Sequence, residues 1–280
     1  MYLAWTLLVE EVLQVPLTAH HVEAGRLDAT HEDLGCGLAW DTIHRVRPRP
    51  MLACTWCGGR VHAKVSPQGL RFFAHDIADL SCPWRGESQA HLYLKTLFAR
   101  LSREAGWHAD VEVPGQGWRA DTLATHPSTG RKVAWEVQLS PANLASLQRR
   151  TETLARDRVA VCWICDRLRH WLGLFPSIQI GAVGPSPFES VGPHSPGVVP
   201  AVLDGHRRYD PATGTWENPG PLKLNVFVTA VLTGNLVNIA VPRRSNLYFP
   251  SVYGPSRRPG TRVWTTPAYA AQFHQHRATR

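Results

Sequence analysis

Hydrophobic and polar positions follow their most regular patterns between residues 87 and 165. Residues 87–106 carry apolar side chains at three- and four-residue spacing and end at Gly106, which predicts an amphipathic helix. Residues 118–125 and 132–140 alternate between apolar and polar, which predicts two strands that the loop HPSTGR joins as a hairpin. A helix with Pro141 at its first position and the strand VAVCWI follow. The predicted order is helix, three strands, helix, strand. The buried stripe of the first helix comprises Ala90, Leu94, Leu97, Phe98 and Leu101.

The remaining sequence divides into segments of different character. Residues 181–200 are dense in Pro, Gly and Ser, which disfavour regular structure. We therefore expect a mixed α/β fold with a β-containing lead-in (1–50), a β module (51–84), the αβββαβ core (85–180), a linker (181–200) and a C-terminal segment (201–280). The last segment predicts a hairpin at HRRYDPATGTWE and helices near Leu222–Leu232 and Ala268–Arg277.

Positive charge is concentrated near the C-terminus. The chain has 30 Lys and Arg against 22 Asp and Glu. No acidic residue follows Glu217, and the bases beyond it account for the whole formal charge of +8. This basic segment is either a solvated surface or a clamp that contacts phosphate groups.

Neither a secretory signal nor a membrane span is expected. The first residues lack a basic region and reach Glu10 and Glu11 early. Residues 224–242 are uncharged but contain several amide side chains, which are costly in hydrocarbon. A helix that ends at Gly234 fits better. Together with six cysteines that suit metal ligation in a reducing compartment, this predicts a cytoplasmic protein.

Residues 52–83 contain a potential zinc site. Cys54 and Cys57 are followed by two glycines, as in a zinc knuckle. The segments RVHAKV and LRFFAH predict a hairpin that returns His75 to the knuckle, and Cys82 follows seven residues later. Cys54, Cys57, His75 and Cys82 thus form a plausible structural Zn²⁺ site, in which His62 or Cys36 could replace one ligand. The alternative is a set of buried thiols with a surface histidine.

A second cysteine pair, Cys162 and Cys165, lies in the apolar segment VAVCWICD. Residues three apart on a strand face opposite sides of the sheet. We expect these thiols to pack in the core and not to share a metal.

The predicted hairpin brings two carboxylates together. If Thr125 pairs with Lys132, then Asp121 lies opposite Glu136 on one face of the sheet. Paired carboxylates repel one another, and a bound Mg²⁺ or Mn²⁺ would compensate for that repulsion. Such an ion polarises a phosphate and activates water, which is the chemistry of a nuclease.

Other polar residues flank this pair. Gln138 follows Glu136 on the same face and could position the attacking water. Glu87, His91 and Lys95 step by four along the first helix, where Glu87 could supply a third metal oxygen and Lys95 a positive charge near the phosphate. These helix residues could equally be solvated. Arg149 and Arg150 are candidates for contacting phosphate, or form an exposed basic face.

Several short motifs occur in the order seen in one family. They are Cys54-Thr-Trp-Cys57-Gly58, Phe73-Ala74-His75, Cys82, Glu87-Ser88-x-x-His91-x-x-x-Lys95, Arg119-Ala120-Asp121 and Glu136-Val137-Gln138-Leu139-Ser140. Together they resemble the CoiA-like competence proteins over about residues 50 to 166.

The resemblance implies a restriction-endonuclease-like core of the PD-(D/E)XK superfamily in a bacterial cytoplasm. It implies a role in processing or recombining DNA, single-stranded or branched, alongside recombination proteins. Asp121 and Glu136 would hold the metal, and Gln138 stands where the superfamily's name has lysine. Two alternatives are a non-catalytic DNA-binding protein that keeps this fold and a restriction or phage-defence nuclease.

Overall fold

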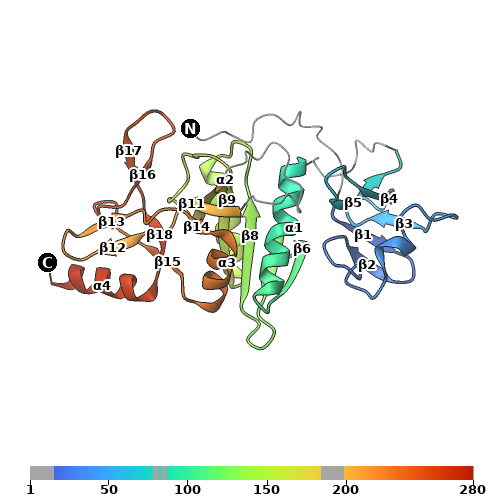
Figure 1. The fold of residues 1–280 in the computed structure, drawn as a ribbon, viewed down its shortest axis with the longest axis horizontal. Coiled ribbons are helices and arrows are strands. Elements are labelled where there is room, and N and C mark those ends of the chain that lie inside the picture. The colour runs from blue at the N-terminus through green and yellow to red at the C-terminus, as the bar shows by residue number, and fades with distance from the viewer. Residues whose placement is uncertain (1–15, 78–81, 83–86, 184–198, 280) are drawn as a thin grey trace.

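The computed structural model describes residues 16–77, 82, 87–183 and 199–279 of the chain. Its described part is a mixed α/β structure that contains two large sheets, three two-stranded sheets and four α-helices. Figure 1 shows the N-terminal sheet at one end of the molecule, the larger sheet in the middle and the C-terminal elements at the other end.

The central sheet has seven strands in the order β14-β11-β10-β9-β8-β7-β6. β6, β7 and β8 are antiparallel, whereas β8 and β9 run parallel and are joined through α2. The order from α1 to β9 is the αβββαβ order that the sequence predicts. The elements are α1 (Gln89–Glu104), β6 (His108–Pro114), β7 (Arg119–Thr125), β8 (Lys132–Val137), α2 (Leu144–Arg156), β9 (Val159–Cys165), β10 (Ser177–Val183), β11 (Val199–Asp204) and β14 (Leu222–Lys223).

Both faces of β8 are buried. On one face Trp135 packs against Phe98 of α1 and Phe227 of α3 (Leu224–Thr233), with ring centroids 5.1 and 6.5 Å away. On the other face Ala134 belongs to a cluster that includes Leu147 of α2. The alternation in residues 132–140 therefore does not separate a core face from an open face, because helices cover this central strand on both sides.

Local side-chain contacts fix where the two core helices begin. Ser88 caps α1 by accepting a hydrogen bond from the backbone N–H of His91. α2 begins at Leu144, since the side chain of Asn143 accepts from the N–H of Ala145. The expectation that Pro141 starts this helix is wrong, because an asparagine cap satisfies the free amides of the first turn.

The N-terminal sheet has five strands in the order β2-β1-β3-β4-β5. It joins residues that the sequence assigned to a lead-in and to a separate β module. The predicted RVHAKV–LRFFAH hairpin is confirmed, and Val61 pairs with His75. The strands are β1 (Thr18–His21), β2 (Gly25–Asp28), β3 (Leu52–Cys54), β4 (Arg60–Val65) and β5 (Arg71–His75), with a 3₁₀ helix at Trp40–Thr42.

The C-terminal segment contains the predicted hairpin and helices. α3 ends at Gly234, whose φ of 81° suits glycine at a helix C-terminus. Most of the predicted linker, residues 184–198, lies outside the described residues, while residues 181–183 continue β10. Among the described helices, none has the length and apolar character needed to cross a membrane. The other elements are β12 (Arg208–Asp210), β13 (Thr215–Glu217), β15 (Val237–Ala240), β16 (Tyr248–Pro250), β17 (Arg257–Pro259), β18 (Arg262–Thr265) and α4 (Pro267–Ala278).

Candidate metal centres

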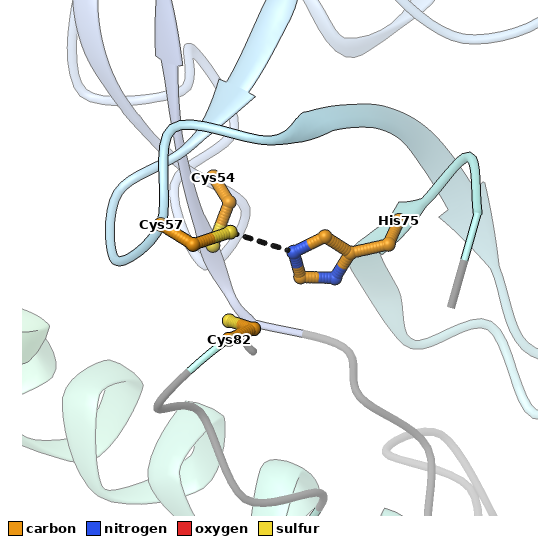
Figure 2. Close-up of side chains that lie close together, drawn as sticks. All are labelled: Cys54, Cys57, His75 and Cys82. Atoms are coloured by element: carbon orange, nitrogen blue, oxygen red, sulfur yellow. Dashed lines mark hydrogen bonds between the residues drawn. The ribbon is translucent and has the colours of Figure 1, made fainter. Parts of the chain in front are cut away.

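Three cysteines and one histidine converge at the end of the N-terminal sheet. The ligand atoms of Cys54, Cys57, His75 and Cys82 all lie within 4.8 Å of one another. Figure 2 shows His75 pointing at the knuckle, with its Nε2 3.3 Å from the Sγ of Cys57. These are the four ligands expected from the sequence, whereas neither His62 nor Cys36 belongs to this cluster.

The cluster fits a structural zinc ion. A tetrahedral Zn²⁺ with Zn–S bonds of about 2.3 Å places its ligand atoms less than about 4 Å apart, which requires only a small contraction of this group. The backbone N–H groups of Trp56 and Gly59 donate to the sulfurs of Cys54 and Cys57, both at 3.4 Å. Burial raises the pKa of Cys54 to about 12, and the thiols of Cys82 and Cys57 add to this effect. This buried sulfur therefore needs a nearby cation to be present as a thiolate. The spacing of the four ligand atoms allows the cluster to hold such a cation, for example zinc.

The second candidate centre lies where β7 and β8 meet. Thr125 pairs with Lys132, as expected, and the ladder continues to Thr122 and Trp135. Beyond this pair, hydrogen bonds to side chains take the place of backbone–backbone hydrogen bonds between the two strands. The backbone N–H of Asp121 donates to Oε1 of Glu136 at 3.3 Å, so the two acidic residues are neighbours, as the hairpin register predicts.

Two candidate ligands lie beside Asp121: Glu87, which directly precedes the N-cap of α1, and His91 in the first turn of that helix. The Nε2 of His91 lies 3.3 Å from Oδ2 of Asp121 and 3.8 Å from Oε1 of Glu87. One ligand atom from each of these three residues lies within 4.8 Å of the others. Their oxygen and nitrogen atoms fit a divalent cation, and the imidazole suits Mn²⁺ better than Mg²⁺. Glu87 lies near Asp121, as expected, and His91 joins them. Glu136, the other metal ligand expected from the sequence, is a neighbour of Asp121 but does not belong to this group of three.

The two carboxyl groups differ in their affinity for protons. Burial raises the pKa of Glu136 to about 8, and the charge of Asp121 adds to this effect. Burial also disfavours the charged form of Asp121, but His91 and Lys95 outweigh it and hold the pKa of Asp121 well below its usual range. Asp121 is therefore the stronger acid of the two, and Glu136 is the carboxyl group that takes up a proton first as the pH falls.

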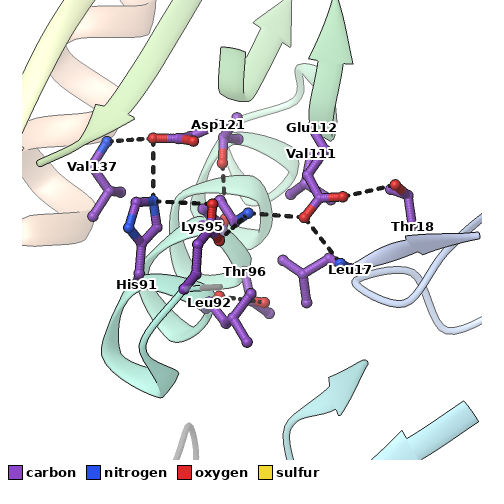
Figure 3. A network of polar contacts seen from close by, with 12 residues as sticks. Leu17, Thr18, His91, Leu92, Lys95, Thr96, Val111, Glu112, Asp121 and Val137 are labelled. Atoms are coloured by element: carbon purple, nitrogen blue, oxygen red, sulfur yellow. Dashed lines mark hydrogen bonds and ion pairs between the residues drawn. The ribbon is translucent and has the colours of Figure 1, made fainter. Parts of the chain in front are cut away.

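Lys95 occupies a buried position behind the candidate ligands. Its side chain is 0 % exposed, and its Nζ lies 2.5 Å from Glu87. The same Nζ lies 2.9 Å from Glu112 (Figure 3). Burial lowers the pKa of Lys95, but the two carboxylates more than compensate and raise it overall. The expectation that Lys95 supplies charge directly to a phosphate does not fit this burial. Lys95 instead neutralises and positions Glu87.

Glu112 connects this network to the N-terminal sheet. Its carboxylate accepts hydrogen bonds from the backbone of Leu17 at 3.0 Å and the hydroxyl of Thr18 at 2.8 Å (Figure 3). Nearby, the guanidinium of Arg119 lies 3.9 Å from the ring centroid of Trp56, which stands between Cys54 and Cys57. The two candidate metal centres are thus linked through packed residues.

Gln138 and Arg150 lie on the far side of Glu136. The side-chain amide of Gln138 donates to the carbonyl and hydroxyl oxygens of Ser140, at 3.1 and 2.9 Å. Its expected role in positioning water stays a prediction. Arg150 of α2 forms an ion pair with Oε2 of Glu136 and stacks on Trp163. This basic residue therefore binds a carboxylate in the described state, although its side chain is 41 % exposed.

Sequence reasoning missed two members of this site. His91 was noted only for its spacing, and that spacing of four from Glu87 was the available signal. Glu112 interrupts the apolar strand DVEV, which indicates a charge with a partner. It adopts a φ of 55°, a left-handed conformation that is rare for residues other than glycine.

The second cysteine pair packs as expected. Cys162 and Cys165 are both fully buried, and they belong to the clusters on opposite faces of the central sheet. Opposite faces prevent them from sharing one metal ion.

Comparison with known proteins gives one match. Residues 87–171 match the family model described as competence protein CoiA, nuclease-like domain. This stretch contains the acidic and imidazole ligands of the second centre, and the match confirms that this part of the chain is CoiA-like. No curated protein and no solved structure gave a significant match to the chain.

Proposed function

We propose that this protein is a metal-dependent nuclease that hydrolyses DNA phosphodiester bonds, with the αβββαβ region as a PD-(D/E)XK-type core. The observation that carries the proposal is the convergence of Glu87, His91 and Asp121 beside Glu136. The CoiA nuclease-like match over the same residues supports it. A role in DNA processing or recombination during competence, together with recombination proteins, follows from that likeness.

Each ligand has a separate part in the proposed chemistry. A divalent ion bound here would polarise the scissile phosphate and activate a water molecule. Asp121, Glu87 and His91 hold the ion. Val137 fixes Asp121, because its backbone N–H donates to Oδ2 at 2.9 Å. Lys95 holds Glu87 in place through an ion pair of 2.5 Å.

Glu136 and Arg150 act on the proton and the phosphate. With a pKa of about 8, Glu136 can exchange a proton near neutral pH, which suits an acid–base group. Because Glu136 is fully buried beneath Arg150, that guanidinium must turn outward before substrate can reach the carboxyl group. Once outward, Arg150 is free to contact the phosphate.

A cleavage assay with added Mn²⁺ or Mg²⁺ tests the proposal. The wild-type protein and Asp121→Asn are incubated with single-stranded, duplex and branched DNA. We expect metal-dependent cleavage by the wild type and a loss of at least 100-fold, on the order of one lost metal or charge contact, in Asp121→Asn. Equal rates for the two proteins, or no cleavage under any condition, would count against a nuclease.

A non-catalytic DNA-binding protein is the second candidate. It is favoured by the buried, neutralised state of Lys95 and by the engagement of Gln138 with Ser140. This alternative predicts salt-dependent DNA binding without turnover.

A further inference from the structure

A cavity of about 360 Å³ opens on the N-terminal sheet, between residues 43–50 and β4. Half of its lining residues carry cationic or imidazole side chains, the others are apolar, and none is acidic. The cationic and imidazole groups are His44, Arg45, Arg47, Arg49, His62 and Lys64. β4 belongs to a different sheet from β7 and β8, which carry Asp121 and Glu136, so this pocket is separate from the candidate hydrolytic centre (Figure 1).

Most of the positive charge in the pocket is not neutralised by the protein. Asp76 lies 2.6 Å from His62 and 3.9 Å from Arg49. Asp41 is close enough to act on the charge of His44. Across residues 16–77, 82, 87–183 and 199–279, no ion pair or side-chain hydrogen bond engages Arg45, Arg47 or Lys64. Like charges held together without a counter-ion repel one another, so an anion in this cavity would be stabilised.

The loop that carries the arginines is held in place by its first turn. The N–H groups of Ile43 and His44 both bond to the carbonyl of Trp40, at 3.1 and 3.0 Å. Trp40 is itself buried against Phe73, with ring centroids 5.9 Å apart. Arg45 adopts a φ of 59°, a conformation that costs energy for this residue type. The start of the arginine-bearing loop is therefore anchored on the N-terminal sheet through Trp40, which reduces the entropy cost of binding a ligand.

We propose that this pocket binds the phosphate backbone of a DNA strand at a distance from the hydrolytic centre. The inference rests on the proposed function, because it takes DNA as the ligand. Three unpaired cations in one cavity match a run of phosphates better than a single anion. His44 is kept neutral by burial and by the charge of Arg45, which lower its pKa, so its imidazole serves as a hydrogen-bond partner and adds no charge at pH 7.

The test compares two triple variants of the full chain. Arg45→Gln/Arg47→Gln/Lys64→Gln removes the pocket charges, and Arg100→Gln/Arg156→Gln/Arg277→Gln removes three exposed charges elsewhere. Fluorescence anisotropy measures binding to labelled single-stranded DNA over a series of NaCl concentrations, without added divalent metal. Circular dichroism melting checks that both variants fold.

The pocket variant is expected to bind at least tenfold more weakly at physiological salt. Its plot of log K against log salt should flatten by about 2, since each phosphate contact on a single strand contributes about 0.7 to the slope. The control variant should keep the wild-type slope within about 0.7, the value of one contact. An equal loss of DNA affinity in the pocket variant and the control variant would overturn the proposal.

Further arms separate other ligands and the nuclease chemistry itself. Inorganic phosphate or dAMP that competes as strongly as the oligonucleotide would overturn a backbone site in favour of a small-anion site. If polyglutamate binds the protein and its binding is weakened as much by the pocket substitutions as DNA binding is, the pocket serves an acidic protein partner and the proposal is overturned.

Metal-dependent hydrolysis of bis(p-nitrophenyl) phosphate, which is too small to span both sites, should be the same in wild type and pocket variant. Absence of that hydrolysis in both would reject the nuclease, while a pocket-specific binding loss would still support the DNA site.

Discussion

The carboxylate of Asp121 takes the place of a strand-pairing bond, because its Oδ2 accepts the backbone N–H of Val137 at 2.9 Å. The register between β7 and β8 holds up to Thr122 and Trp135 and gives way to side-chain contacts at this position. The same oxygen faces His91 at 3.3 Å. A backbone donor on one strand thus fixes the orientation of a candidate metal ligand on the next.

The thiolate cluster predicts a stably bound structural metal. Purified protein should contain about one zinc per chain, and cobalt substitution should give the visible absorption of a tetrahedral thiolate site. Cys57→Ser should lose the metal and lower the melting temperature, since binding energy at such sites is also folding energy. Cys162→Ala removes a buried thiol outside the cluster and should keep the zinc. Full metal content in Cys57→Ser would contradict the assignment.

Glu136 predicts that metal binding at the second centre releases a proton. Its raised pKa of about 8 means that Glu136 binds a proton more readily than an ordinary carboxyl group near neutral pH, so a cation bound here competes with that proton. Metal affinity should therefore rise by up to tenfold per pH unit between pH 7 and 8 and level off above that range. Calorimetric titration of Mn²⁺ in buffers of different ionisation enthalpy measures the released proton. In Glu136→Gln this pH dependence should disappear; if it persists, another group is responsible.

His91 predicts a preference among metal ions. An imidazole ligand favours Mn²⁺ over Mg²⁺, because Mg²⁺ binds oxygen ligands almost exclusively. His91→Asn should weaken Mn²⁺ binding by about 10- to 100-fold, as for the loss of a supporting ligand contact, and affect Mg²⁺ much less. His108→Asn, an exposed histidine on β6, is the control. Equal effects on both ions would show that His91 positions Asp121 without touching the metal.

Lys95 predicts a large cost for breaking a buried charge network. Lys95→Met would leave Glu87 and Glu112 without their shared cation, and removal of one partner from a buried pair costs about 3–5 kcal/mol. Arg100→Met on the same helix breaks only an exposed contact with Glu104, which is worth about 0.3–0.5 kcal/mol. Urea unfolding measures both. The double variant Lys95→Met/Glu112→Gln should be more stable than the single variant, because one uncompensated charge is removed.

Local pattern was enough to predict much of this site. The hairpin register follows from the loop HPSTGR between Thr125 and Lys132, because loop length fixes which residues of a hairpin pair. The zinc ligands follow from the knuckle and the second hairpin. Both signals act over short stretches of sequence.

The remaining features depend on contacts between distant segments. The pairing of Lys95 with Glu112 requires the helix to pack on β6, and no local pattern specifies that contact. Burial of β8 on both faces depends on α3, which lies far along the chain. The ion pair between Glu136 and Arg150 depends on how α2 returns over the sheet. For these residues the sequence shows a charge without showing its partner.

Arg150 predicts a coupling between the protonation of Glu136 and catalysis. Its positive charge opposes the effects that raise the pKa of Glu136, so Arg150→Ala should raise that pKa further. Metal affinity at pH 7 should then fall and the pH needed for half-maximal binding should move upward. DNA cleavage at saturating metal should also slow, because the variant lacks the guanidinium that we propose contacts the phosphate. Arg149→Ala removes an exposed arginine next to it and should change neither quantity. If Arg150→Ala slows cleavage at every pH without moving the metal-binding midpoint, Arg150 acts on the substrate alone and its contact with Glu136 has no part in metal loading.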